Sequence, residues 1–328
     1  MKLARVILDG KPTSVASTDE TNLLPLEPLL PQELTKDGLL SLIAGGEPAL
    51  AMVRSALQQA GADAFVNADS VEAWNPPLEN PGKICGVAMN NSASNERKIS
   101  APDHPAFFLK PASCLVGHGQ AIRIRSYYGS VHPEPELAVV IGKKARDIDA
   151  ADALEYVFGY SIFNDITGNG MRAEDLFRYW ALYASADNPD QLERREQHLS
   201  YAARYKGTDT FGVLGPWIVT ADEISNPDNL DVHCAIRDEV IAEDSTRYYN
   251  YRVAELVSFI SQFHTLNPGD IVSCGTAFKP SKDRKSIHHA NFQVVGGPVS
   301  VSIQGLGTQV NPVEVEERTI GNWRLEKN

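Results

Sequence analysis

The sequence predicts an α+β fold that is mostly β, with a small α/β unit in front of a larger β-rich region. Two observations support this fold class. From residue 83 onward, short apolar runs alternate with Gly and Pro, which is typical of strands joined by tight turns. Within that region, two segments, residues 150–156 and 252–263, have the character of helices.

Residues 1–80 are expected to form a small N-terminal domain, and residues 81–328 a catalytic domain. The N-terminal part opens with a strand-like run at residues 2–8, and two short helices follow that break at Gly45-Gly46. The Pro- and Gly-rich stretch at residues 75–82 is a plausible linker.

The predicted strands of the larger region are apolar runs bounded by turn residues. They are residues 84–89, 106–109, 121–124, 137–142, 157–163, 217–220, 271–273 and 299–303. The clearest helix covers residues 252–263, because its apolar residues recur at helical spacing. These residues are Val253, Leu256, Val257 and Ile260.

Composition and charge limit the functional classes. The chain has 328 residues, of which 43% are hydrophobic and 22% charged, so it can form a sizeable core. Its formal net charge of -12 argues against a broad nucleic-acid or anionic-membrane surface, because phosphate binding needs clustered cations. We therefore expect neither a nucleic-acid nor a membrane partner.

Cysteine usage and the N-terminal run predict a cytoplasmic protein. The four cysteines include no CxxC pair, so reduced and buried thiols are expected. The first apolar run stops at Asp9-Gly10, which is too short for a signal peptide and fits a first strand. No apolar run reaches the ~18 residues of a membrane helix.

The most informative segment is the acidic one before the apolar run at residues 137–142. Glu134 and Glu136 are two positions apart, so on an extended strand both point to the same face. Two like charges that close are tolerated when both face solvent or when a cation lies between them. Taken alone, such a pair is more often a solvent-facing one.

A second acidic segment favours the cation. The apolar run at residues 157–163 leads to Asp165, 29 positions after Glu136. Carboxylates at strand ends supply the hard oxygen ligands that Mg²⁺ and Mn²⁺ prefer, and Ca²⁺ is a candidate substitute. Neither Cys nor His stands near them at zinc spacing. Glu134, Glu136 and Asp165 are therefore the predicted metal ligands.

These carboxylates and several further motifs, in colinear order over about residues 83–315, resemble the fumarylacetoacetate hydrolase family. The further motifs are residues 107–111, 206–211, 215–217, 266–270, 275–276, 305–307 and 311–313. The resemblance implies a mixed β-roll catalytic domain, commonly a homodimer, with Mg²⁺ or a similar cation on the three carboxylates. It also implies 2-oxo or 1,3-dioxo acid substrates. In this interpretation Lys206 polarises the substrate carbonyl, and Gly275 and Thr276 bind the substrate carboxylate.

The sequence departs from the family pattern in the lid that activates water. Family hydrolases carry a His and a Glu there, whereas this chain has Ser94 at the position expected for His and keeps Glu96. Glu96 is either a general base with a pKa raised by burial or an exposed loop residue without a catalytic role. His288 or His289 could replace the missing lid histidine, although a turn pair is the plainer interpretation.

The second departure is an insertion between Asp165 and Lys206, which are 41 positions apart, about twice the spacing expected from the family. We expect an aromatic-bearing helical insertion that either caps the pocket or contacts a second subunit. Arg172, at its start, is a candidate for a second substrate carboxylate, with a solvated arginine as the alternative.

Two enzyme functions follow from the resemblance. The first is a metal-dependent hydrolase that cleaves a C–C bond in an acylpyruvate-type 2,4-dioxo acid of aromatic catabolism. The alternative is a decarboxylase, tautomerase or hydratase/dehydratase of a 2-oxo acid on the same metal. The missing lid histidine shifts weight toward the alternative, because enolate chemistry needs the metal but no attacking water.

Overall fold

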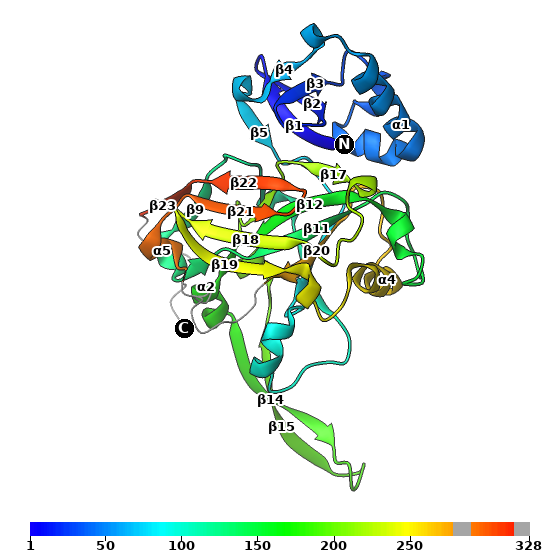
Figure 1. The fold of residues 1–328 in the computed structure, drawn as a ribbon. Helices are drawn as coiled ribbons and strands as arrows, with labels where there is room; N and C mark the ends of the chain where they lie inside the picture. The colour runs from blue at the N-terminus through cyan, green and yellow to red at the C-terminus, as the bar shows by residue number, and fades with distance from the viewer. Residues whose placement is uncertain (278–289, 318–328) are drawn as a thin grey trace.

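A computed structural model describes residues 1–277 and 290–317 of the chain. Strands dominate it, which confirms the mostly β fold class, and its largest sheet has 13 strands in these residues (Figure 1). Most strand pairs are antiparallel, whereas β20 with β6 and β16 with β8 are parallel, so the sheet is mixed. No helix in the described ranges has both the length and the apolar character needed to cross a bilayer.

The main path of the large sheet joins ten strands. In spatial order they are β4 (Val66–Asn67), β3 (Asn22–Pro25), β2 (Lys11–Ser17), β1 (Lys2–Leu8), β17 (Ile218–Thr220), β12 (Val157–Asp165), β11 (Pro135–Ile141), β20 (Ile271–Thr276), β6 (Ile84–Ala88) and β7 (Ala106–Lys110). Three strands branch from it: β5 (Ala73–Asn75), β8 (Leu115–Val116) and β16 (Gly212–Leu214).

Smaller sheets complete the strand inventory. They are β19 (Glu239–Ser245), β18 (Asp231–Ile236), β21 (Val299–Ile303) and β22 (Gly307–Asn311) in one sheet, and the pairs β10 (Val131–His132) with β13 (Thr167–Gly168), β9 (Ile122–Arg125) with β23 (Val313–Glu316), and β14 (Leu176–Ala184) with β15 (Leu192–Ser200).

Five α-helices and nine short 3₁₀ turns lie in the described residues. The helices are α1 (Leu39–Gln59), α2 (Asn169–Glu174), α3 (Ala203–Gly207), α4 (Val253–Phe263) and α5 (Phe292–Val295). The 3₁₀ turns are η1 (Gln32–Leu34), η2 (Ala62–Ala64), η3 (Ala68–Ser70), η4 (Ser92–Arg97), η5 (Ala112–Cys114), η6 (Ser126–Tyr128), η7 (Ala153–Tyr156), η8 (Ala221–Glu223) and η9 (Thr246–Tyr248).

The N-terminal unit shares its first strand with the larger part of the molecule. β1 pairs with β2 and β5 within the unit, and Lys2 and Leu3 pair with Val219 and Ile218 of β17. Strand pairing therefore runs across the boundary proposed at residue 80. Independent folding of residues 1–80 stays a prediction.

Helix α1 contains the break expected at Gly45-Gly46. Gly46 has φ 60° and ψ −147°, so two helical segments meet at a kink there. A positive φ is accessible to glycine without the steric penalty that a Cβ would bring. Both halves bury apolar residues, such as Leu42 and Val53, in the cluster that contains Leu3 of β1.

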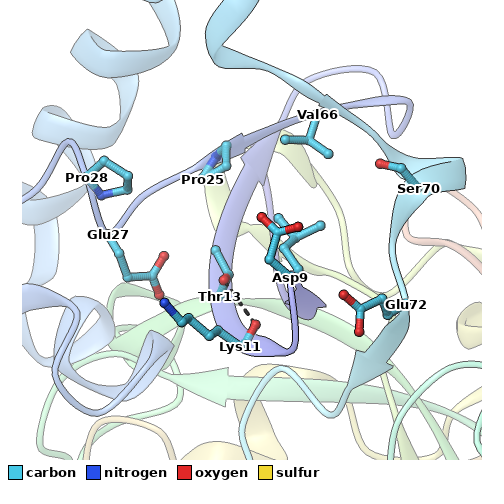
Figure 2. Close-up of a pocket in the computed structure, with 10 residues that line it drawn as sticks. Asp9, Lys11, Thr13, Pro25, Glu27, Pro28, Val66, Ser70 and Glu72 are labelled. Atoms are coloured by element: carbon cyan, nitrogen blue, oxygen red, sulfur yellow. Dashed lines mark hydrogen bonds between the residues drawn. The ribbon is translucent and has the colours of Figure 1, made fainter.

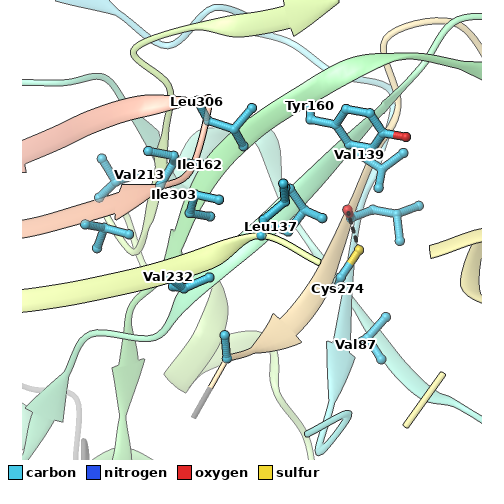
Figure 3. Close-up of a cluster of buried hydrophobic side chains, with 14 of the residues drawn as sticks. Val87, Leu137, Val139, Tyr160, Ile162, Val213, Val232, Cys274, Ile303 and Leu306 are labelled. Carbon is cyan, nitrogen blue, oxygen red and sulfur yellow. Dashed lines mark hydrogen bonds between the residues drawn. The ribbon is translucent and has the colours of Figure 1, made fainter. Parts of the chain in front are cut away.

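The main core lies between the large sheet and the four-stranded sheet. Leu137 of β11 and Ile162 of β12 belong to the same buried cluster as Val232 of β18 and Ile303 of β21 (Figure 3). Alternating inward-facing residues of two sheets form such a layer. This core fixes β11 and β12, the two strands that carry the acidic residues.

Of the helices predicted in the larger region, one is confirmed and two are wrong. α4 buries its predicted stripe of Val253, Leu256, Val257 and Ile260. Residues 150–156 form only the 3₁₀ turn η7, because so short a segment gains few helical hydrogen bonds for its nucleation cost.

The insertion between Asp165 and Lys206 begins with the short helix α2, but its aromatic-bearing part, residues 176–200, is a β-hairpin instead of the helical segment that the sequence predicts. β14 and β15 pair in register from Leu176 opposite Ser200 to Ala184 opposite Leu192. Its aromatic residues favour a strand, and Asn188-Pro189 in the connection favours a turn.

Candidate metal centre and its surroundings

Three carboxylates meet because β11 and β12 pair antiparallel. Pro135 lies opposite Asn164, so the start of β11 is beside the end of β12. The Asp165 amide donates to the Glu134 carbonyl at 2.9 Å, and the Glu134 amide donates to Asn164 Oδ1 at 2.9 Å. One carboxylate oxygen each from Glu134, Glu136 and Asp165 then lies within 4.8 Å of the others.

Glu136 is a buried carboxylate that three donors of β20 surround. Its side chain accepts hydrogen bonds from Ser273 Oγ at 2.5 Å, the Gly275 amide at 3.0 Å and Thr276 Oγ1 at 3.2 Å. Burial, together with the nearby Asp165 charge, raises the pKa of Glu136 to about 8. A cation between these carboxylates would relieve that repulsion.

Gly275 approaches Glu136 through a backbone conformation that suits glycine. Its φ is +95°, and a Cβ there would lie 2.9 Å from the Asn90 Cβ and 3.1 Å from the Val87 carbonyl oxygen. The register of β20 against β11 places Thr276 opposite Glu136. Gly275 and Thr276, two of the three predicted substrate-binding residues, therefore lie at the triad, where they hydrogen-bond the Glu136 carboxylate.

Lys206 lies between two of the carboxylates. Its Nζ donates to Glu134 Oε2 at 2.6 Å and to Asp165 Oδ2 at 2.5 Å, and it is buried on α3. Burial opposes the ammonium charge, but Asp165 and Glu134 outweigh it, so the pKa of Lys206 lies above its ordinary value. Lys206 is a positively charged donor.

Glu134 is held ionised by its neighbours. Burial disfavours its charge, yet the Lys206 ammonium and the His132 hydrogen bond at 3.1 Å keep the pKa of Glu134 well below its usual range. His132 is fully buried, and its other ring nitrogen lies 3.3 Å from Asn169 Nδ2. His132 thus orients a candidate ligand.

Lys110 also lies at this site. It belongs to the motif at residues 107–111, but the sequence did not lead us to predict it as a site residue. It is 3% exposed, and its Nζ donates to Asp165, to the Lys206 carbonyl and to the Phe211 carbonyl, the last at 3.0 Å. Its place at the end of an apolar strand could have indicated this role, because a lysine buried there requires charged or carbonyl partners for its ammonium group.

The residues present fit a divalent cation. Three hard carboxylate ligands converge, two ammonium groups already compensate their charge, and the donor set contains no thiolate. The Nδ2 atom of Asn164, beside Asp165, is buried without a hydrogen-bond partner in the described residues. A water or ligand oxygen at the centre would be a suitable acceptor for it.

Two predicted site residues are not brought to the triad by any contact within the described ranges. Glu96 is exposed on η4, and Arg172 is exposed on α2, with its guanidinium 5.9 Å from the centre of the Tyr205 ring. Exposure favours the solvated alternatives for both. His288 and His289 lie outside the described residues.

The segment before η4 is anchored by buried amides. Asn90 Nδ2 donates to the carbonyls of Tyr251 and Cys274 at 3.0 and 2.9 Å, and Asn91 Nδ2 donates to Asp244 at 3.0 Å. Asn90 and Asn91 therefore have structural partners, which the sequence pattern of the lid did not reveal.

A hollow in the N-terminal unit is separate from the triad. The pocket in Figure 2 lies between β2, β3 and the segment around Ser70, and the carboxylates of Asp9, Glu27 and Glu72 line it. None of its lining residues belongs to the metal centre.

The fold and the acidic centre together define the class of this protein. Residues 83–314 match the family model described as "Fumarylacetoacetate (FAA) hydrolase C-terminal", and the chain belongs to that family. The family prediction from the sequence is confirmed, and the matched range contains the triad, Lys110 and Lys206.

Curated relatives include mitochondrial oxaloacetate tautomerases. The chain is 32% identical to the mitochondrial oxaloacetate tautomerase of Xenopus laevis, over 82% of this chain and 76% of the relative. It is 30% identical to the mitochondrial oxaloacetate tautomerase of Homo sapiens, over 89% of this chain and 83% of the relative.

Solved structures share the fold. Maleylpyruvate hydrolase from Sphingobium sp. SYK-6, in complex with manganese(II) and pyruvate, has a TM-score of 0.70 at 24% identity, covering 97% of this chain and all of that one. Fumarylacetoacetate hydrolase from Exiguobacterium antarcticum has a TM-score of 0.70 at 24% identity, covering 96% and 100%.

Proposed function

We propose that this protein is a divalent-metal-dependent tautomerase of a 2-oxo acid of the oxaloacetate class. The observation that carries the proposal is the triad of Glu134, Glu136 and Asp165 with the Lys206 ammonium between two of its members. The oxaloacetate tautomerases at 30–32% identity support the substrate class. Mg²⁺ or Mn²⁺ is the proposed ion.

The residues divide between those that hold the ion and those that hold the substrate. The three carboxylates would bind the cation, which would supply Lewis acidity at the oxygens of a 2-oxo acid. Lys206 keeps its proton, so its Nζ would donate to an oxyanion rather than remove a proton. Gly275 and Thr276 are the proposed contacts of a substrate carboxylate.

The charge of the centre favours an anionic substrate. With all three carboxylates ionised, as cation binding requires, they and the ammonium groups of Lys110 and Lys206 leave one negative charge. A bound divalent cation would turn this into one positive charge, in a buried place where electrostatic attraction is strong. This balance would suit the carboxylate and enolate oxygens of a 2-oxo acid.

The sequence of the lid also favours a tautomerase. Keto–enol exchange needs proton transfer but no attacking water, so it does not require the histidine whose position holds Ser94. Glu96, the other residue of a hydrolytic lid, is exposed.

The second candidate is the C–C bond hydrolase of acylpyruvate-type acids. The activity that gives the family its name favours it, as does the presence of Glu96 in η4. In that case Glu96 would activate water, which requires η4 to bring this carboxylate over the substrate.

One set of assays separates the candidates. Purified protein with Mg²⁺ or Mn²⁺ is mixed with the enol form of oxaloacetate, and loss of enol absorbance is followed; acylpyruvates are tested in parallel for pyruvate release. The tautomerase predicts faster enol loss and no acyl cleavage. Pyruvate release that disappears in Glu96→Gln would instead establish the hydrolase.

Glu136→Gln is the control for the metal centre. It should abolish either activity and weaken Mn²⁺ binding measured by calorimetry. Full turnover in this variant would contradict the proposed ligand set. The cytoplasmic location stays a prediction.

A further inference from the structure

The hairpin formed by β14 and β15 (residues 176–200, here the arm) is inserted between the short helices α2 and α3. Figure 1 shows it extending away from the sheets. In the described part of the chain, its two strands pair only with each other, and it exposes Phe177 on one face and Trp180 on the other. Because a lone two-stranded hairpin is at best marginally stable, the arm does little to fix where its two ends lie. Contacts at the base of the arm must therefore hold α2 and α3 together.

Arg204 of α3 makes these contacts. Its Nε donates to the two carboxylate oxygens of Asp175 at 3.0 and 3.1 Å, and its Nη2 donates to Asp175 Oδ1 at 2.8 Å. The same Nη2 donates to Glu174 Oε2 at 3.0 Å and to the Met171 carbonyl at 3.2 Å. Hydrogen bonds between charged groups are stronger than neutral ones. One guanidinium group therefore ties α3 to the C-terminal end of α2.

Arg204 and Lys206 leave α3 in different directions. They are two positions apart, and side chains at that spacing on a helix do not face each other. Arg204 points to α2, whereas the Lys206 Nζ lies 2.6 Å from Glu134 Oε2 and 2.5 Å from Asp165 Oδ2. Helix α3 has only five residues, too few to form stably without tertiary contacts. The orientation of α3, and with it the place of the Lys206 ammonium, therefore depends on the contacts on both sides.

These contacts form a closed ring that includes a candidate metal ligand. The Glu134 carboxylate accepts from Lys206 through Oε2, and its Oε1 lies 3.1 Å from His132 Nε2. The other ring nitrogen of His132 lies 3.3 Å from Nδ2 of Asn169, the first residue of α2. Arg204 joins the other end of α2 to α3 and so closes the ring at Lys206. Movement of α3 away from α2 would break the ring at Arg204.

We propose that Arg204 is a positioning residue, which holds α3 so that the Lys206 ammonium stays between Glu134 and Asp165. Arg204 acts on the centre through Lys206. The inference rests on the proposed function, in which Lys206 donates to the oxyanion of the substrate. Because a donor must stand at hydrogen-bond distance from the developing charge, a small displacement of Lys206 lowers the rate of the chemical step.

Arg54 provides a matched control. Its side chain is 34% exposed and that of Arg204 is 35% exposed, and each lies on a helix and pairs with two carboxylates. The partners of Arg54 are Glu47 of α1 and Asp222 of η8, neither of which belongs to the triad. Arg204→Met and Arg54→Met therefore remove the same charge and the same donors, one at the base of the arm and one elsewhere.

Hydrogen exchange of these variants tests the place of α3 without reference to activity. The Lys206 amide donates to the Ala202 carbonyl at 2.9 Å within α3. In Arg204→Met it should exchange at least roughly tenfold faster than in the wild type or in Arg54→Met, while the amides of β11 and β12 keep their protection. Unchanged exchange in α3 would overturn the proposal. So would an equal rise in α3 and β11, because Arg204 would then stabilise the whole fold and not α3 in particular.

Turnover of the enol form of oxaloacetate by the Mn²⁺-loaded protein tests the consequence for Lys206. In Arg204→Met, kcat should fall at least about tenfold with little change in KM, because a contact made in the transition state is displaced. Arg204→Lys keeps one charged donor and should lie between Arg204→Met and the wild type. An unchanged kcat, or a loss confined to KM, would overturn the proposal. A wild type without enol turnover would instead contradict the proposed function, and the exchange of α3 would then decide the role of Arg204.

Discussion

At the residue scale, the candidate metal centre is organised by charge compensation. Asp165 is paired with two ammonium groups, Lys110 and Lys206, and both lysines are buried. A buried charge that loses its partner carries the full desolvation penalty. The two lysines therefore allow three carboxylates to exist together before any cation arrives.

Lys110→Met tests this directly. Loss of the buried ammonium leaves Asp165 with Lys206 alone and two carbonyls without their donor, so the free energy of unfolding should fall by about 3 kcal/mol or more. Urea denaturation measures it. Lys144→Met, which removes an exposed lysine, should change stability by less than about 0.5 kcal/mol. Equal stability of the two variants would contradict the role given to Lys110.

At the element scale, strand pairing rather than sequence proximity assembles the site. Glu136 belongs to β11 itself. The pairing of β12 with β11 brings Asp165 beside it, and the pairing of β20 with β11 brings Thr276 beside it. Near the end of β20 the register against β11 shifts, and Gly275 there adopts a positive φ and donates its amide to Glu136. A change at this glycine should therefore affect both the fold and the ligand.

Gly275→Ala separates backbone strain from steric overlap. The new Cβ meets Asn90 and the Val87 carbonyl, so the loss of stability should exceed the ~1 kcal/mol expected of a positive φ alone. Gly119→Ala is the control, since Gly119 has φ +76° and open space around its Cβ position. Thermal unfolding compares the two, and a Gly275→Ala variant no weaker than Gly119→Ala would contradict the close packing described.

At the scale of the whole molecule, metal binding should be coupled to folding. An ion that binds only the folded chain adds about 2.7 kcal/mol of stability at about 100 times its dissociation constant. Mn²⁺ should therefore raise the unfolding midpoint of the wild type in urea, and should leave that of Glu136→Gln nearly unchanged. An equal rise in both proteins would place the ion elsewhere.

The size of this effect should depend on pH. The pKa of Glu136 is raised to about 8, so below that pH a proton competes with the cation for this carboxylate. Apparent Mn²⁺ affinity should rise as pH increases toward 8, by up to about tenfold per unit, and then level off. Calorimetry in buffers of different ionisation heat should detect the released proton. An affinity independent of pH between about 6 and 8 would contradict the raised pKa.

The sequence alone determined the family and most of the strands. Glu134, Glu136 and Asp165 could be predicted as a group because the first two stand at the start of an apolar strand and the third at the end of another, and such charges repel unless solvent or a cation compensates them. Helix α4 was identifiable because its apolar stripe has helical spacing. The sequence predicted a helix for the arm, since a segment with exposed aromatic residues on both faces has no core-facing periodicity to reveal its structure.

Only the tertiary structure decided which groups surround the carboxylates. Lys110 is 55 positions from Asp165 along the chain and Ser273 is 137 positions from Glu136, and strand pairing brings each into contact with its carboxylate. The sequence therefore predicted acidic residues at the start of one strand and at the end of another. The fold decided their charge balance, because burial and through-space partners set the pKa of Glu134 and of Glu136.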